Sequence, residues 1–232
     1  MTKERIGLIV GAGAGLSASL AKKFSGEGIK VALAARDTNK LGDLANEIDA
    51  AVYHCDASNP KSVQDLFKSI QIDLGDPEVV VFNASKRVRG EINEIDADEV
   101  RDAILTTCYG GFLVGQQASK IMLKTGRGTI MFTGASAGVK GFAKSATFAM
   151  GKFGLRGLAQ SMARELHPQN VHVVHVIVDG GIRSEVKSDH SRQAKDSWLL
   201  PDAIADTYYH LHTQHRSAWT WEIEVRPWVE NF

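Results

Sequence analysis

A glycine-rich turn near the start of the chain is suited to hold an anion. Gly11, Gly13 and Gly15 follow a short apolar run and precede a helical pattern that begins at Leu16. Glycine lets backbone N–H groups approach a phosphate, and the N-terminus of the next helix carries partial positive charge. The spacing Gly11-x-x-x-Gly15-x-Ser17, set between a strand and a helix, therefore predicts a dinucleotide site. The alternative is a plain structural turn. Ser17 is small enough for close packing, and its hydroxyl is a further candidate phosphate ligand.

Short polar or glycine-containing motifs also follow four later apolar runs. These motifs are Asp56-Ala57, Asn83-Ala84, Ser136, and Gly180-Gly181-Ile182-x-Ser184. Parallel sheets bind ligands at the carboxyl ends of their strands, where the strand order reverses. We therefore expect these motifs to meet the glycine turn at one edge of a sheet.

The elements that must position these residues alternate between strand-length apolar runs and longer helical patterns. The predicted strands are residues 6–10, 29–35, 51–55, 78–82, 129–133, 171–178 and 219–225. The predicted helices are residues 16–24, 37–48, 59–70, 98–124, 145–167 and 201–212. Strands that are apolar on both faces and separated by helices indicate a parallel sheet covered on both sides. The pattern predicts an α/β single-domain Rossmann fold over residues 1–232, with a doubly wound, mostly parallel seven-stranded sheet.

Taken in order, the motifs resemble those of the short-chain dehydrogenase/reductase family over essentially the whole chain. The glycine turn is similar to the family's GxxxGxG, with Ser17 at the last glycine. The resemblance implies that Asp56 and Ala57 bind the adenine and that Asn83 and Ala84 brace the sheet beside the cofactor. It also implies that the segment from Gly180 to Ser184 holds the nicotinamide, although Asp179 stands where the family has proline.

The end of the second predicted strand bears on the choice of cofactor. An acidic residue there implies NAD in this family, and a basic residue one position later implies NADP. Here Ala35 ends the strand and Arg36 follows it. A guanidinium pairs well with a 2′-phosphate, so NADP is favoured over NAD. The alternative is a solvated surface arginine.

The family resemblance also implies a catalytic set, from which one member is missing. Ser136 matches the serine that polarises the substrate oxygen, and Lys152 matches the lysine that binds the nicotinamide ribose. Phe148 stands four residues before Lys152, where the family has its tyrosine acid, and Thr107 stands at the family's asparagine. Phenylalanine cannot donate a proton. The candidate replacements for the proton donor are Ser136, Tyr109, and Lys152 acting through water if burial lowers its pKa. The alternative roles are structural: Tyr109 as a packing residue and Ser136 as the cap of a turn.

These observations predict an NADP-dependent oxidoreductase that acts on a small carbonyl or alcohol with an atypical proton donor. The alternative is a catalytically impaired protein that binds the dinucleotide and senses its redox state. The segment 183–200, the family's substrate lid, is short and polar, which favours a small polar substrate. The resemblance implies a homodimer or homotetramer, and six glycines on the two long helices would permit close packing there.

Composition excludes several other classes. Lys plus Arg and Asp plus Glu both number 27, so no net basic field attracts nucleic acid or an anionic membrane. No apolar run approaches the length of a membrane span, and a cytoplasmic location is expected. The two cysteines have no metal-ligand spacing, and the histidines share no spacing with carboxylates, so no metal site is predicted.

Overall fold

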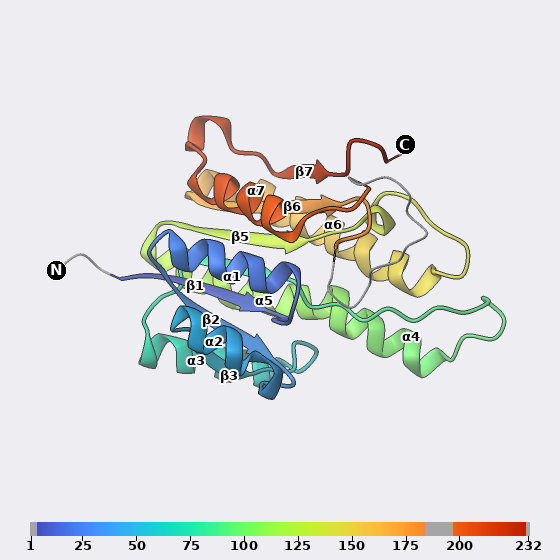
Figure 1. Cartoon of the computed structure of the whole chain (residues 1–232), viewed down its shortest axis with the longest axis horizontal. Helices are drawn as coiled ribbons and strands as arrows, with labels where there is room; N and C mark the ends of the chain where they lie inside the picture. Colours follow the sequence, from blue (N-terminus) through green and yellow to red (C-terminus); the bar gives the residue numbers. More distant parts are fainter. Residues whose placement is uncertain (1–3, 184–196, 231–232) are drawn as a thin grey trace.

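The computed structural model describes residues 4–183 and 197–230. Seven strands form one sheet in the order β3-β2-β1-β4-β5-β6-β7, and every neighbouring pair is parallel (Figure 1). The strands are β1 Arg5–Val10, β2 Ile29–Ala35, β3 Ala51–His54, β4 Val79–Phe82, β5 Gly128–Thr133, β6 Val171–Val178 and β7 Glu222–Val225. The predicted doubly wound parallel sheet is confirmed.

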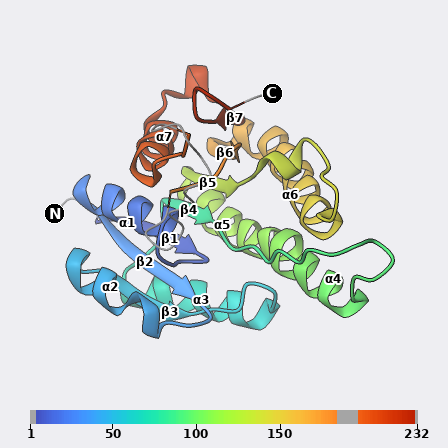
Figure 2. The ribbon, with the colours of Figure 1, turned by 45° about the vertical axis from the view of Figure 1, so that its right-hand side comes forward.

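Helices cover both faces of the sheet (Figure 2). They are α1 Leu16–Gly26, α2 Gly42–Ile48, α3 Pro60–Asp73, α4 Ala97–Ile104, α5 Gly110–Thr125, α6 Ala146–Leu166 and α7 Pro201–Thr213. One apolar core lies under α3, α5 and α6, and the other lies under α1 and α7. Because the sheet is covered twice, its central strands have no solvent-facing side, and every residue of β4 and β6 is buried.

The segment predicted as one helix over residues 98–124 is divided into three parts. A π-helical turn, Leu105–Tyr109, separates α4 from α5. Gly110 and Gly111 follow it directly, and a Cβ on Gly110 would lie 2.8 Å from the Ala57 carbonyl oxygen. Gly110 therefore lets α5 run against the loop after β3. Single π turns inside helices frequently occur near functional sites.

The glycines of the long helices mostly serve contacts within this one chain. A Cβ on Gly111 would lie 2.4 Å from Leu155 Cδ1, and a Cβ on Gly154 would lie 2.6 Å from Cys108 Sγ. By contrast, Gly157 has open space around its Cβ position. The close packing predicted from these glycines thus joins α5 and the π turn to α6, whereas the predicted homo-oligomer stays a prediction.

Within the described ranges 4–183 and 197–230, no helix combines the length and apolar character needed to cross a membrane.

Candidate active site

The candidate site lies at the carboxyl ends of the strands, around the point between β1 and β4 where the strand order reverses. Two cavities of about 490 Å³ and about 810 Å³ open there. Asn83 and Ser85, which follow β4, line both cavities. The two cavities therefore adjoin and make one elongated site.

The glycine turn has the geometry that an anion-binding turn requires. Gly11 adopts a φ of 84°, and a Cβ there would lie 2.4 Å from the Ala84 backbone nitrogen. Gly13 and Gly15 have open space where a side chain would stand. No side chain caps the start of α1, and its first turn holds no acidic residue. Backbone N–H groups at this helix end are thus left for an external acceptor, which fits a pyrophosphate.

Ser17 and Asn83 hold the glycine turn in place through hydrogen bonds. The Ser17 hydroxyl donates a hydrogen bond to the Gly11 carbonyl oxygen at 3.1 Å and accepts one from Asn83 Nδ2 at 2.7 Å. Ser17 is buried, and the Asn83 backbone nitrogen donates to the Val10 carbonyl oxygen. The hydroxyl that the sequence offered as a phosphate ligand is therefore used to tie β4 to the glycine turn.

The smaller cavity combines basic and acidic side chains. Arg36 and Lys40 line it beside Asp56 and Ala57. Burial acts to raise the pKa of Asp56, but hydrogen bonds from the Ser58 hydroxyl and backbone and the nearby Arg36 charge bring it below its ordinary value. The carboxylate is therefore ionised at neutral pH and acts only as an acceptor. Lys40 was not predicted; its only signal in the sequence is a second basic residue four positions after Arg36.

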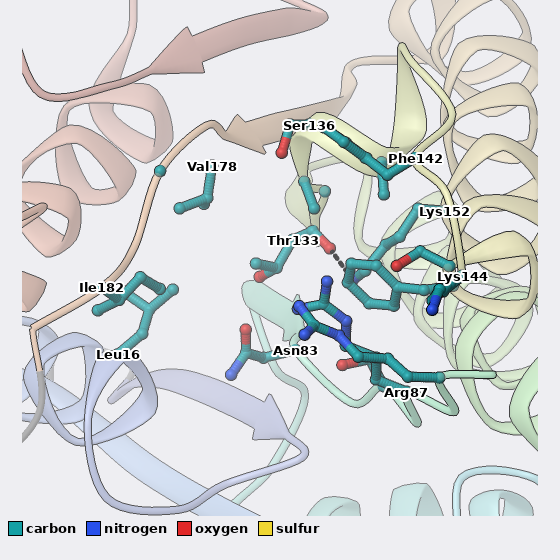
Figure 3. A pocket seen from close by; sticks show the side chains of 18 of the residues that line it. Leu16, Asn83, Arg87, Thr133, Ser136, Phe142, Lys144, Lys152, Val178 and Ile182 are labelled. Atoms are coloured by element: carbon teal, nitrogen blue, oxygen red, sulfur yellow. Dashed lines mark hydrogen bonds between the residues drawn. The ribbon is translucent and has the colours of Figure 1, made fainter. Parts of the chain in front are cut away.

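Lys152 is a fully buried ammonium at the wall of the larger cavity. Its Nζ donates a hydrogen bond to the Thr133 carbonyl oxygen at 2.7 Å, the dashed line in Figure 3. Burial lowers the pKa of Lys152 to about 8. A lysine with a pKa this close to neutral is able to supply a proton near pH 7.

Phe148 and Ser136 line the same cavity as Lys152. The Phe148 ring centroid lies 5.6 Å from Lys152 Nζ and 4.9 Å from the Arg87 guanidinium carbon. Figure 3 shows the Ser136 hydroxyl and the Arg87 guanidinium approaching the cavity from opposite walls. Arg87 was not predicted, because it lies in the irregular segment after β4 and matches no motif.

The two candidates from the π-helical turn lie elsewhere. Thr107 is buried, and its hydroxyl accepts a hydrogen bond from the Lys86 backbone nitrogen at 3.1 Å. Tyr109 is 38% exposed and stacks on Phe112, with ring centroids 6.0 Å apart. Neither residue lines the larger cavity. Thr107 thus positions the segment that carries Arg87, and Tyr109 is not brought to the Ser136 and Lys152 side chains.

The segment after β6 contributes part of the wall. Gly180 and Ile182 line the larger cavity, while the Gly181 carbonyl oxygen accepts a hydrogen bond from the Leu199 backbone nitrogen. Asp179, at the family's proline position, is buried and pairs with Arg226 at 3.1 Å. Ser184 and most of the predicted lid lie outside the described residues.

Most of the predicted cofactor residues therefore reach one of the two cavities. Those that do are Gly11, Leu16, Arg36, Asp56, Ala57, Asn83, Ala84, Lys152, Gly180 and Ile182. Gly13, Gly15 and Ser17 belong to the turn itself and line neither. Within the part of the chain that the structure describes, no group of three or more His, Cys, Asp or Glu side chains is arranged to hold a metal ion.

Comparison with known proteins places this architecture in one family. Residues 5–195 match the family model described as short chain dehydrogenase. A short-chain dehydrogenase structure from Rhodopseudomonas palustris is 35% identical, with a TM-score of 0.85 and coverage of 97% of this chain and 99% of that one. A metagenomic short-chain oxidoreductase solved in complex with NADP is 27% identical, with a TM-score of 0.84 and coverage of 97% and 98%.

A relative found by sequence comparison covers nearly the whole chain as well. An uncharacterized oxidoreductase of Staphylococcus aureus (strain N315) is 26% identical over 230 residues, which cover 97% of each chain. The likeness thus spans the glycine turn, the larger cavity and the C-terminal strand together. The chain belongs to the short-chain dehydrogenase family.

Proposed function

We propose that this protein is an NADP-dependent oxidoreductase that acts on a small carbonyl or alcohol substrate. The observation that carries the proposal is the continuity of the site. One elongated space runs from Arg36, past the glycine turn and Asn83, to Ser136 and Lys152. Such a space suits an extended dinucleotide with a substrate at its far end. The relative solved with NADP, at 27% identity, supports the same cofactor class.

The chain's own residues fit the two ends of this cofactor. The open glycine turn and the uncapped start of α1 receive the pyrophosphate. Arg36 meets the 2′-phosphate that distinguishes NADP from NAD, with Lys40 beside it. Lys152 and the segment at Gly180 and Ile182 hold the nicotinamide half. The bound dinucleotide supplies or accepts the hydride.

The remaining chemistry is the movement of one proton. In the reducing direction the carbonyl carbon gains a hydride, so the carbonyl oxygen gains the electron pair of the broken π bond and takes up a proton. Ser136 donates a hydrogen bond that holds this oxygen. The proton comes from Lys152 Nζ through water, because burial brings the pKa of Lys152 to about 8 and Phe148 has no proton to give. Lys152 then regains a proton from solvent.

A second candidate function is supported by Phe148. An apolar ring lines the cavity at the position where the family resemblance implies a proton donor. General acid–base catalysis typically contributes about 10²–10⁴-fold to a rate, so its loss favours a protein that binds the dinucleotide and responds to its redox state without rapid turnover.

Fluorescence titration with NADPH and, separately, NADH tests the cofactor assignment. We expect NADPH to bind more tightly than NADH. Arg36→Ala should weaken NADPH binding about tenfold, the value of a charge-assisted contact, and leave NADH binding unchanged. Arg164→Ala, at an exposed position on α6 away from both cavities, is the matched control. Binding of neither dinucleotide would overturn both candidate functions.

A carbonyl and alcohol panel then separates the two candidates. Turnover of NADPH or NADP by the wild-type protein, lost in Lys152→Met and reduced in Ser136→Ala, supports the oxidoreductase. Tight binding of the dinucleotide without turnover of any panel member supports the sensor.

A further inference from the structure

The larger cavity has an unbalanced charge. Four basic side chains line it, namely Arg87, Arg89, Lys144 and Lys152. No aspartate or glutamate is among its lining residues in the described part of the chain. A cavity lined by one sign of charge raises the local concentration of ligands of the opposite sign.

Two of these four cations are already engaged. Lys144 pairs with Glu91, with 2.6 Å between Nζ and Oε1. Lys152 is bound to the Thr133 carbonyl oxygen. Over residues 4–183 and 197–230, no carboxylate lies within ion-pair distance of Arg87 or Arg89. Both side chains line the cavity and are exposed to solvent, so their charge is available to an anion that enters it.

Arg87 is held at the reacting end of the cavity. Its guanidinium packs over the Phe148 ring at 4.9 Å, a cation–π contact. Figure 3 shows the guanidinium reaching into the centre of the pocket, between Asn83 and the Thr133 and Lys152 side. Its pKa is lowered by burial and by the charge of Arg89. A counter-charge would relieve both effects.

Phe148 gives this contact a clear physical role. An aromatic face without a hydroxyl offers the guanidinium a flat platform and no competing hydrogen bond. The planar fork of an arginine held this way presents parallel N–H donors, which match the two oxygens of a carboxylate or phosphate.

We infer that Arg87 binds an oxyanion of the substrate, a carboxylate or a phosphate, so that the site selects an acidic carbonyl compound over its neutral analogue. This inference rests on the proposed oxidoreductase function and names its substrate class. The anion at Arg87 is distinct from the dinucleotide's phosphates, because Gly11 and Arg36 line the smaller cavity and Arg87 does not. Arg89 adds to the same field.

Matched substrate pairs test the inference. The pairs are 4-oxopentanoate with pentan-2-one, 2-oxobutanoate with butan-2-one, and dihydroxyacetone phosphate with dihydroxyacetone. Each is assayed as NADPH oxidation with wild type, Arg87→Met and Arg87→Lys. Arg101→Met, an exposed arginine on α4 that does not line the cavity, is the control.

We expect wild type to favour the anionic member of a pair. Arg87→Met should lose about 10- to 100-fold in kcat/KM on the anion, the range for lost charge-assisted hydrogen bonds, and change less than about threefold on the neutral partner. Arg87→Lys should recover part of the loss. The pair that shows the preference tells carboxylate from phosphate. Equal loss on both members, or no preference for the anion, overturns the inference.

A binding measurement covers the case in which no pair is turned over. Oxalate and inorganic phosphate are titrated by calorimetry into the protein, with and without NADPH. Binding of either anion that is lost in Arg87→Met, but kept in Arg101→Met, supports the inference; absence of such binding overturns it. The NADPH titration is read separately. Loss of NADPH affinity in Arg87→Met, with anion binding unchanged, assigns Arg87 to the cofactor and also overturns it.

The two levels of failure remain distinct. Wild-type protein that binds no dinucleotide refutes the proposed function, whereas protein that binds NADPH but shows no anion preference refutes only the substrate class.

Discussion

Replacing Lys152 with methionine is expected to make the protein more stable at neutral pH, although it removes a central residue of the site. Lys152 is 3% exposed, and its ammonium donates one hydrogen bond, to the Thr133 carbonyl oxygen. A buried charge with so few partners is costly. Methionine has a similar length and shape and carries no charge, so the substitution keeps the packing and removes the cost.

The pKa of Lys152 sets the size of the effect. Burial lowers it from 10.5 to about 8. A difference of about 2.5 pKa, at about 1.4 kcal/mol for each, makes the protonated lysine cost the folded state about 3 kcal/mol. Loss of the hydrogen bond to the Thr133 carbonyl oxygen offsets about 1 kcal/mol of this gain in stability. We therefore expect Lys152→Met to raise the free energy of unfolding at pH 7 by about 2 kcal/mol.

The sign of the pH dependence follows from the same shift. The folded-state pKa lies below the unfolded value, so the unfolded chain holds the proton more tightly. The destabilisation is fully present below pH 8 and declines as the pH rises from 8 toward 10.5. At pH 9.5 the advantage of the methionine variant should therefore have fallen by about 2 kcal/mol.

Urea unfolding of the dinucleotide-free protein at pH 7 and pH 9.5 measures this difference. Titrating groups common to both proteins cancel when the variant is compared with wild type. The change with pH in the difference between their free energies of unfolding (the stability gap) therefore reports Lys152 alone. Lys120→Met, at an exposed position on α5, is the control and should show almost no gap at either pH. An equal gap at both pH values would refute a depressed pKa, and with it the assignment of the proton to Lys152.

Two further predictions concern the packing behind the site and the aromatic ring that lines it. Gly110→Ala should lower the free energy of unfolding by about 1–3 kcal/mol, because its Cβ would stand 2.8 Å from the Ala57 backbone oxygen. Gly157→Ala, with open space at its Cβ, should be neutral or should stabilise the protein by up to about 1 kcal/mol. Thermal unfolding of both variants measures these changes, and similar losses in the two would contradict the packing argument. Phe148→Tyr should raise turnover of a slow carbonyl substrate by up to about 10²-fold, measured as NADPH oxidation beside Phe148→Leu. A tyrosine variant no faster than the leucine variant would show that a hydroxyl at this position donates no proton.

Local sequence pattern was sufficient for much of the sheet. The predicted bounds of β2 and β6 coincide with those observed, because apolar runs buried on both faces end where glycine or polar residues begin. The last strand is shorter than predicted and begins at Glu222. Trp219 is held instead by a hydrogen bond to the Gln214 carbonyl oxygen and by stacking on His172. That contact joins distant segments, and no local pattern records it.

The divided helix was not predictable for a related reason. Apolar spacing continues through residues 98–124, so periodicity alone favours one helix. The π-helical turn depends on how closely Gly110 and Gly111 approach the loop after β3 and α6. The same limit applies to Tyr109: the sequence places it two residues after Thr107, but only the turn decides that it stacks on Phe112.

In the candidate site, the glycine turn, Arg36 and Asn83 are predictable because each directly follows a strand, and Lys152 is predictable because it stands four residues after Phe148 on α6. Arg87 follows β4 by five residues, in a segment with no regular structure. Its orientation is set by a ring on α6, more than 60 residues away in the sequence. Charge without a spacing rule gives no signal until the fold brings the two partners together.

Phe148 connects the two proposals. Its ring lies close to two cations, Arg87 at 4.9 Å and Lys152 at 5.6 Å. An anion placed beside this ring would stabilise the charged form of both groups. An acidic substrate bound at Arg87 would supply that anion and would act to raise the pKa of Lys152 while bound. The proton on Lys152 would therefore be held more firmly in the substrate complex than in the free protein. For an acidic substrate, the apparent pKa in the pH profile of kcat should then be higher than the apparent pKa in the profile of kcat/KM. A neutral ketone would not produce this difference.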